Sequence, residues 1–520
     1  MLWIALHLPQ LSLESFAATL PPGAGAQALA LTDAHLIVSA NAAARALGVQ
    51  PGLKRATALA LAPHLTLGQA DRSRDAQALT AVAHAALAYT PAVAIQPVSD
   101  AVAASAADAS PHTVLLEVQA SLRYFGGLPP LLERLQAALA PLGHRLHVVS
   151  AVTALGAALL ARVHARLHCA DLAATRRALD AAPVWLLGPG REHWDALQGM
   201  GLRTLADLRT VPRDGLARRF GEVVLSELDR AMGTRPDPRE PLTLPSTFDS
   251  RLELCARADT AEQLMHGAAV LLARLVAWLS AQHAFVRRFV LVMHHERHLR
   301  RTAGSAATPL DIALAEPARD AAHLLLLLRE RLAQLQLPAP TLELSLHAHD
   351  IARRAPPNAE LFPTARSEQE GLTRLIERLQ ARLGAEQVVR LVPLEDHRPE
   401  RASAWRVADA RLARTRSRTP PPGSPAEPVA TGAARVVRPV WLLARPEPLH
   451  ERQGGPWLDG APLQLLSGPE RIEAGWWDAA LAERDYFIAR TPDGALVWVY
   501  RARLAVAASA PGWFLQGRFG

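Results

Sequence analysis

Short apolar strands alternate with alanine-rich helices over the first 168 residues, and this alternation limits the possible folds more than any other feature of the chain. The hydrophobic periodicity predicts strands at 2–8, 114–118 and 146–152 and helices at 41–47, 57–61, 75–89, 128–139 and 154–168. Strands that alternate with helices favour an α/β domain, in which helices cover a sheet. A run of small residues at 99–110 interrupts the pattern and is predicted to be a surface insertion.

The rest of the chain divides into regions of different composition, as expected for 520 residues, which are too many for one core. Residues 170–232 are predicted to be helical. Residues 246–350 predict a strand, a helix, three strands, a helix and a strand, or an order close to this, with both helices on one face. After a tether rich in Arg and Pro at 411–428, six of the eleven tryptophans lie at 439–520. The sequence thus predicts an α/β and α+β multidomain protein with a small Trp-rich C-terminal domain.

Composition narrows the classes of partner and compartment. The net charge is +7, which favours a polyanion such as nucleic acid, although a genomic bias toward arginine is the alternative. Cys169 and Cys255 are far apart, which excludes a disulfide framework or a cysteine-based zinc site. Uninterrupted apolar runs such as 324–328 are too short to span a bilayer, and no signal-peptide pattern opens the chain. We therefore expect no membrane partner and a cytoplasmic, nucleoid-associated location.

Two short helices joined by a Gly-Met-Gly turn are predicted at 194–208. Thr204 and Asp207 have the spacing of a capping box that begins the second helix. Glycines let the backbone approach a phosphate closely, and helix N-terminal amides then point at it. The pattern predicts a helix-hairpin-helix that binds the DNA backbone, with an ordinary helical hairpin as the alternative. The candidate DNA-binding residues here are Gly199, Met200, Gly201, Arg203, Thr204, Arg218 and Arg219.

Two further clusters have side chains suited to binding. Arg287 and Arg288, together with arginines at 297, 300 and 301, would follow phosphates if they shared a face, and a solvated patch is the alternative. Histidines at 294, 295 and 298, and His347 and His349 with Asp350, have spacings that a metal could use. Surface histidines are the preferred interpretation of both groups, so no metal site is predicted.

Together these segments resemble the Y-family DNA polymerases. Residues 44–53 are similar to the fingers motif of that family, residues 116–127 to a palm strand and turn, and residues 151–162 to the next palm strand and helix. Residues 468–487 are similar to the tails of a catalytically deficient bacterial branch that acts in inducible mutagenesis. The resemblance implies a palm at 1–10 and 75–168, fingers at 11–74, a helix-hairpin-helix thumb at 169–235, a linker at 236–245, a little finger at 246–352, a clamp-motif region at 353–400, a flexible linker at 401–438 and a partner-binding domain at 439–520.

The chain departs from the family where the metal ligands are expected. A polymerase of this family holds two Mg²⁺ ions with carboxylates, but His7 and Pro9 stand at the first positions. Histidine is a poor ligand for Mg²⁺, which prefers oxygen. The Asp-Glu pair falls on 99–100 when counted forward and on 112–113 when counted back from Glu117. We predict no catalytic residue, metal or cofactor, with His7, Pro9, Asp100 and Glu117 as degenerate positions. Unaligned acids such as those at 33 or 108 are the alternative.

Other family contacts are partly retained. In the fingers, Arg45 remains as a nucleotide contact, whereas the family's tyrosine and palm lysine are replaced by alanines at 42 and 154. Asn358, Leu361 and Phe362 resemble the short peptide with which bacterial polymerases bind the sliding clamp, and a segment that packs on its own domain is the alternative.

The resemblance implies an adapter rather than an enzyme. Its implied partners are damaged or primer-template DNA, the sliding clamp, a RecA-like ImuA-type protein and an error-prone C-family DNA polymerase. An active, metal-dependent translesion polymerase is the first alternative. A simple helix-hairpin-helix DNA-binding protein is the second.

Overall fold

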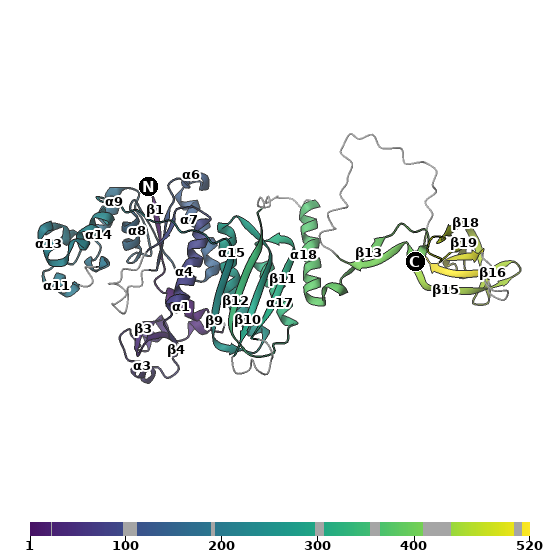
Figure 1. The fold of residues 1–520 in the computed structure, drawn as a ribbon, viewed down its shortest axis with the longest axis horizontal. Coiled ribbons are helices and arrows are strands. Elements are labelled where there is room, and N and C mark those ends of the chain that lie inside the picture. The colour runs from purple at the N-terminus through teal and green to yellow at the C-terminus, as the bar shows by residue number, and fades with distance from the viewer. Residues whose placement is uncertain are drawn as a thin grey trace. The chain divides into compact units, whose positions relative to one another are not determined.

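The computed structural model describes residues 1–21, 23–96, 112–188, 193–296, 306–353, 365–408, 438–503 and 512–519. The chain divides into two compact units, Met1–Glu368 and Gln369–Gly520 (Figure 1). The predicted fold class is confirmed, because the first unit is mixed α/β and the second is rich in strands. The predicted residue boundaries of the individual domains stay a prediction.

A five-stranded sheet, the palm sheet, forms the centre of the first unit. Its order is β5-β6-β1-β7-β8, with β1 antiparallel to both of its neighbours. Its strands are β1 (Trp3–His7), β5 (Val93–Ile95), β6 (Thr113–Glu117), β7 (His147–Ala151) and β8 (Arg166–His168). Its surrounding helices are α1 (Leu11–Ala17), α4 (Arg72–Leu87), α6 (Leu122–Phe125), α7 (Leu128–Leu139) and α8 (Ala154–Ala161). The predicted helix at 154–168 was too long, because it ends at Ala161 and β8 follows.

Alternation along β1 assigns the two faces of the palm sheet. Ile4 and Leu6 are buried with α4 and α7, whereas Ala5 is buried with α8 on the opposite face. Odd-numbered residues of β1, His7 included, therefore lie on the α8 face.

The fingers form a small second sheet in the order β3-β2-β4. Its elements are β2 (Leu29–Asp33), β3 (Leu36–Ala40), α2 (Ala42–Ala46), α3 (Arg55–Leu61) and β4 (Thr66–Gln69). The Asn41 side chain begins α2 by accepting a hydrogen bond from the Ala44 amide at 2.9 Å and also donates to the Gln27 carbonyl at 2.6 Å. Sequence periodicity predicted the two helices and missed this sheet.

The thumb is helical, as predicted. It contains α9 (Leu172–Asp180), α11 (Trp194–Gly199), α12 (Leu205–Thr210), α13 (Arg213–Phe220) and α14 (Glu222–Met232). Leu179, Leu205 and Leu228 share one buried cluster with Leu160 of α8. The thumb therefore packs on the same face of the palm sheet that holds His7.

The proline-rich linker after the thumb is tied to the palm rather than free. The Leu242 amide donates to the Val93 carbonyl at 2.7 Å. Arg239 pairs with Asp237 at 2.6 Å and donates to the Gln96 side chain at 2.7 Å. Because Arg239 and Asp237 are both largely buried, this segment is a fixed connection.

The little finger is a four-stranded antiparallel sheet in the order β11-β10-β12-β9. Its elements are β9 (Phe248–Ala258), α15 (Ala261–Ala281), β10 (Ala284–His295), β11 (Ala307–Ala318), α17 (Ala321–Ala333) and β12 (Thr341–Arg353). Helix α15 packs on β9, β10 and β12, and α17 packs on β11 and α15. The described residues hold one strand fewer than the longest predicted order, and both helices cover one face, as predicted.

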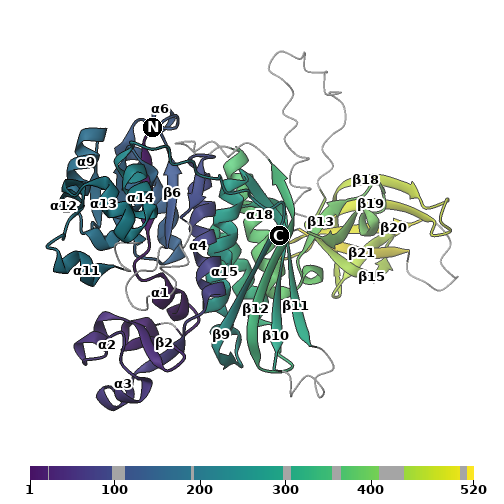
Figure 2. The ribbon, with the colours of Figure 1, turned by 60° about the vertical axis from the view of Figure 1, so that its left-hand side comes forward.

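Helix α15 is the core helix of the little finger. By length and composition it could cross a membrane, with a mean hydropathy of 1.6, which the search for uninterrupted apolar runs missed. It instead buries Leu271, Leu275 and Trp278 against the sheet. It also lies beside palm helix α4 in both Figure 1 and Figure 2.

Buried Arg274 of α15 links the little finger to the palm. Its Nη1 donates to the side chains of Gln77 on α4 and Ser250 on β9, and to the Arg251 carbonyl, each at 3.2 Å. Burial lowers the pKa of Arg274 to about 10, so it remains charged at neutral pH. All three of these hydrogen-bond acceptors are neutral oxygen atoms.

The second unit holds a hairpin and a seven-stranded sheet in the order β17-β16-β15-β21-β20-β19-β18. Helix α18 (Ala365–Leu383) crosses the boundary between the units, and β13 (Val389–Pro393) pairs with β14 (Ser403–Val407). The sheet strands are β15 (Trp441–Arg452), β16 (Gly455–Leu458), β17 (Ala461–Pro462), β18 (Gln464–Ala474), β19 (Ala482–Arg490), β20 (Leu496–Ala502) and β21 (Trp513–Arg518). Strand β14 lies inside the segment 401–438 that was predicted to be a flexible linker, and residues 409–437 lie outside the described residues.

Candidate functional site

His7 ends β1 in the region where a Y-family enzyme would hold metal, and it is buried, with 6% of its surface exposed. Its Nδ1 lies 3.0 Å from the hydroxyl of Thr113, the residue opposite it on β6. His147, opposite it on β7, places its ring centroid 5.8 Å from that of His7. Burial, together with the smaller effect of the Arg162 charge, lowers the pKa of His7 to about 3. His7 is therefore neutral at neutral pH.

Among the residues that the structure describes, the groups that contact His7 or shift its pKa are basic or neutral. The guanidinium of Arg162 donates to the Leu186 carbonyl at 3.0 Å and stacks over Trp185. His147 Nδ1 lies 2.9 Å from the Ala161 carbonyl. The described titratable groups that shift the pKa of His7 are Arg162, His147 and His112, and none of them is a carboxylate. We name His7, Thr113, His147 and Arg162 the palm cluster.

Glu117 and Pro9, the other described degenerate positions, do not join the palm cluster. Glu117 stands at the far end of β6 from Thr113, four residues or about 13 Å along the strand. Its carboxylate accepts the amides of Leu2 at 3.4 Å and Gln119 at 3.2 Å, which is a structural role. Pro9 is exposed in the turn after β1, and Asp100 lies outside the described residues. Of the two placements predicted for the Asp-Glu pair, 112–113 lies beside His7, and 99–100 lies outside the described residues.

One buried carboxylate near this region, that of Asp75, was not predicted from the sequence. Asp75 begins the buried part of α4, and it accepts hydrogen bonds from the hydroxyls of Ser12 and, at 2.7 Å, Ser15. Burial lowers the pKa of His112, and the charge of Asp75 acts in the opposite direction. Because α4 covers the face opposite His7, Asp75 is not a member of the palm cluster.

The thumb hairpin has the predicted capping box but not the predicted free amides. Thr204 and Asp207 cap each other's backbone, and Gly201 has a φ of +81°. The amides from Met200 to Leu202 donate to carbonyls of the preceding turn, and those of Arg203 and Thr204 donate to the Asp207 carboxylate. The prediction that the amides after Gly199 point at a phosphate is therefore wrong, because the hairpin uses them internally.

Side chains remain as the cationic surface of the thumb. Arg203, Arg218 and Arg219 are exposed, and the Arg219 guanidinium lies over the Phe220 ring. Two neighbouring arginines are paired with acids instead: Arg209 with Asp180 at 2.5 Å and Arg213 with Asp229 at 2.6 Å. In the fingers, Arg45 is exposed on α2.

Of the arginines predicted to cluster on the little-finger face without helices, the structure describes Arg287 and Arg288. Arg288 is exposed but forms an ion pair with Asp311 on β11. Arg251 pairs with Glu343 at 2.7 Å on the same face. Arg287 is exposed at a bulge in β10. The other predicted arginines (297, 300, 301) and the clamp residues Asn358, Leu361 and Phe362 lie outside the described residues.

Two histidines of this face join a carboxylate that the sequence did not indicate. His347 and His349 of β12 gather with Asp249 of β9, and one ligand atom from each lies within 4.8 Å of the others. His347 Nδ1 is 2.5 Å from Asp249 Oδ1. Asp350, the predicted companion, is not in this group. Among the residues that the structure describes, this is the one group of three or more His, Cys, Asp or Glu side chains close enough to share a metal ion.

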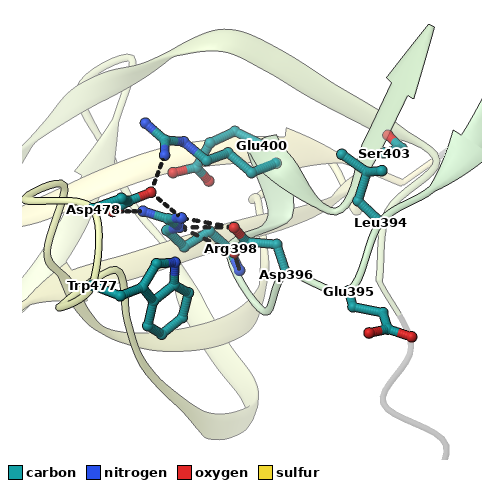
Figure 3. Close-up of a pocket in the computed structure, with 9 residues that line it drawn as sticks. Leu394, Glu395, Asp396, Arg398, Glu400, Ser403, Trp477 and Asp478 are labelled. Atoms are coloured by element: carbon teal, nitrogen blue, oxygen red, sulfur yellow. Dashed lines mark hydrogen bonds and ion pairs between the residues drawn. The ribbon is translucent and has the colours of Figure 1, made fainter. Parts of the chain in front are cut away.

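The second unit has an open hollow of about 450 Å³ organised by Arg398 (Figure 3). The buried guanidinium donates to the carboxylates of Asp396 and Asp478, each at 2.7 Å, and stacks on Trp477. These hydrogen bonds lower the pKa of both carboxyl groups to about 2. The network ties the β13–β14 connection to the segment after β18, so we assign it a structural role.

The tail tryptophans divide into core and surface. Trp498 and Trp513 are buried in the sheet and belong to its core. Trp441, Trp476 and Trp477 are exposed by 71%, 78% and 53%, and the last two stack edge to face. These three side chains therefore present apolar surface to solvent.

No family model matches the chain. It is 29% identical over 493 residues to Protein ImuB from two strains of Caulobacter vibrioides, a match that covers 91% of this chain and all of each relative. Similar solved structures are a Dbh ternary complex with partially disordered substrates (14% identity, TM-score 0.36), DinB from Sulfolobus solfataricus (16%, 0.38) and an insertion ternary complex of Dbh DNA polymerase (14%, 0.37), each covering 68% of this chain and 99% of that chain. These TM-scores are all below 0.5, so the three similarities establish nothing further about this chain. The sequence similarity along nine-tenths of the chain supports an ImuB-type protein.

Proposed function

We propose that this chain is a polymerase-like adapter in error-prone translesion DNA synthesis. It binds damaged primer-template DNA and leaves nucleotidyl transfer to a separate polymerase. The observation that carries the proposal is the palm cluster, in which the described side chains around His7 are Thr113, His147 and Arg162 rather than carboxylates. The similarity to ImuB supports a polymerase-like role.

The chemistry of the palm cluster argues against two-metal catalysis. Mg²⁺ needs oxygen ligands, and carboxylates in particular, to offset its charge. A neutral, buried imidazole hydrogen-bonded to a threonine hydroxyl supplies no negative charge, and the nearby Arg162 charge repels a divalent cation. Glu117 is too far along its strand to assist.

Primer extension tests this proposal directly. Purified full-length protein, a primed template, dNTPs and either Mg²⁺ or Mn²⁺ are expected to give no extended product, while an active Y-family polymerase extends the same primer. Template-directed incorporation that disappears in Asp100→Ala would instead establish the alternative, an active translesion polymerase with displaced ligands.

The DNA contact is proposed to run through exposed arginines of the thumb. Arg218→Ala with Arg219→Ala removes two unpaired cations. Each lost phosphate contact should lower the slope of log affinity against log salt by about 0.9. Arg209→Ala with Arg213→Ala is the matched control, since it removes the same charge from residues already paired with acids. Equal loss of affinity in both doubles would contradict a specific thumb contact.

Clamp docking is proposed to use Asn358, Leu361 and Phe362. Leu361→Ala with Phe362→Ala should abolish capture of the protein by an immobilised sliding clamp, because an apolar pair inserted in a pocket carries most of such an interface. The thumb double Arg218→Ala with Arg219→Ala should be captured normally. Unchanged capture of the Leu-Phe double would leave a DNA-binding protein without this partner.

Recruitment of a RecA-like ImuA-type protein and a C-family polymerase is proposed for the C-terminal unit. Trp476→Ala with Trp477→Ala removes two exposed aromatic anchors and should reduce co-purification of at least one partner. Trp405→Ala, an exposed tryptophan on the β13–β14 hairpin, is the control. Such a role places the protein at the nucleoid in the cytoplasm, which is part of the proposal.

A further inference from the structure

The little-finger sheet has an open face on which two imidazoles and one carboxylate converge. From this geometry we propose that Asp249, His347 and His349 bind a divalent transition-metal ion, with Zn²⁺ as the best fit. The inference does not depend on the proposed adapter function, because it concerns a different domain and a different donor set from the palm.

Strand geometry fixes the three side chains on one face. His347 and His349 are two residues apart on β12, so both project to the same side of the sheet. Asp249 is the direct antiparallel partner of His347 on β9. The intervening Ala348 is buried on the helix-covered face, as is Phe248 beside Asp249. The backbone register thus brings the ligands together without help from a loop.

The distances suit a small coordination sphere. Zn²⁺ binds nitrogen and oxygen at about 2.0–2.2 Å, which puts tetrahedral ligand atoms about 3.4 Å apart. The three ligand atoms lie within 4.8 Å of one another, so side-chain rotation alone can close the site. The His347 and His349 rings are nearly parallel, at 14°, and the Asp249 carboxylate already faces His347. Replacing that single hydrogen bond by two metal bonds requires no change of strand register.

A further polar group can orient the carboxylate. The Thr247 hydroxyl lies 3.5 Å from Asp249 Oδ2, the oxygen that His347 does not use. Outer hydrogen bonds of this kind hold metal ligands in position. The site also has room for a fourth ligand, because the side chains of His347 and Asp249 remain 34% and 52% exposed.

The donor set predicts which ions bind. Two imidazoles and one carboxylate favour Zn²⁺, Ni²⁺ or Cu²⁺, whereas Mg²⁺ prefers an all-oxygen shell. Coordination would also join β9, the edge strand of the sheet, to β12. The ion would therefore stabilise the pairing of the edge strand β9 with β12.

Calorimetric titration of untagged full-length protein with Zn²⁺ tests the site. We expect one site per chain that a large excess of Mg²⁺ does not displace. His349→Ala and Asp249→Asn should each weaken this site by about tenfold or more, since each removes one of only three protein ligands. His294→Ala is the matched control, because it removes a histidine of the same sheet face from outside the trio.

The pattern across the variants decides the matter. Loss of the site in His349→Ala and Asp249→Asn, with retention in His294→Ala, supports the proposal. Equal binding by wild type and His349→Ala, or equal loss in His294→Ala, overturns it. Circular dichroism of each variant confirms the fold, and Co²⁺ provides a second readout, because its visible absorption bands should be present in wild type and absent from Asp249→Asn.

Discussion

The palm cluster and the little-finger cluster (Asp249, His347 and His349) each contain two histidines, but their surroundings are opposite. The palm histidines lie on the neighbouring antiparallel strands β1 and β7, whereas both little-finger histidines lie on β12. In the palm, His7 and His147 are held with Thr113 and Arg162, and burial keeps His7 neutral. In the little finger, His347 and His349 stand with Asp249 and are open to solvent. Histidine is thus a buried, hydrogen-bonded core residue in the palm and a solvent-accessible candidate metal ligand in the little finger.

The difference teaches that the partners of a histidine, rather than its spacing, decide its chemistry. A hydrogen bond to a hydroxyl inside a core stabilises the fold without any ion. A carboxylate at a solvent-accessible edge supplies negative charge that a cation can use. Changes in the palm should therefore alter stability without metal, and changes in the little finger should alter it only with metal.

The largest expected effect is that of His7→Ala. Truncating a fully packed side chain leaves a cavity and an unpaired Thr113 hydroxyl, which should lower the free energy of unfolding by about 3 kcal/mol. Urea unfolding measures it, with the exposed His35→Ala as control. Restoration of the lost stability by added Mg²⁺ or Zn²⁺ would break the comparison, because the palm would then hold a cation.

Acid sensitivity should separate the two clusters next. The pKa of His7 is about 3 in the folded protein and 6.5 in the unfolded chain. The unfolded chain therefore takes up a proton first, and stability that is complete above pH 6.5 is lost as pH falls toward 3. At pH 5 this amounts to about 2 kcal/mol. In His7→Gln, the free energy of unfolding should fall less steeply between pH 6 and pH 4, by about one proton. Parallel curves for the two proteins would refute the buried neutral state.

A smaller effect is expected from Thr113→Val. This substitution preserves the volume of a side chain that is 1% exposed and removes only the hydroxyl partner of His7. The free energy of unfolding should fall by about 1 kcal/mol. A larger fall in the double His7→Ala with Thr113→Val than in His7→Ala alone would mean that the two side chains act independently.

The smallest effect should come from His349→Ala in the presence of a chelator. His349 is exposed, and its ring stacks on that of His347 with the ring centroids 6.3 Å apart, so its removal should change the free energy of unfolding by less than about 0.5 kcal/mol. With Zn²⁺ present, wild type alone should gain stability, because an ion that binds only the folded state shifts the unfolding equilibrium. A similar gain in His349→Ala would remove the contrast between the two clusters.

Local patterns allowed much of this architecture to be predicted from the sequence. The strands at β1, β6 and β7, helix α7 and the Thr204–Asp207 capping box depend on residues close in the chain, and all of them were predicted. Strand β8 was missed because Arg166–His168 is too short to show alternation and follows a helix without a break in composition.

Long-range pairing explains what the sequence could not supply. Asp249 and His347 are 98 residues apart, so only the β9–β12 register brings them together. The same holds for His7 and Thr113, which face each other across the 99–110 insertion. The amides of the thumb hairpin were misjudged because glycine spacing indicates a turn but not which carbonyls satisfy its donors.

Arg274 has a consequence for how the first unit responds to a ligand. Its guanidinium is charged, shielded from water and surrounded by neutral oxygens, one of which belongs to the palm. Separating α15 from α4 would expose apolar surface, which opposes opening, but it would also rehydrate that guanidinium, which favours opening. The contact between palm and little finger is thus stabilised by apolar burial and destabilised by the buried charge of Arg274. A polyanion that places negative charge near Arg274 would change the balance between these two contributions.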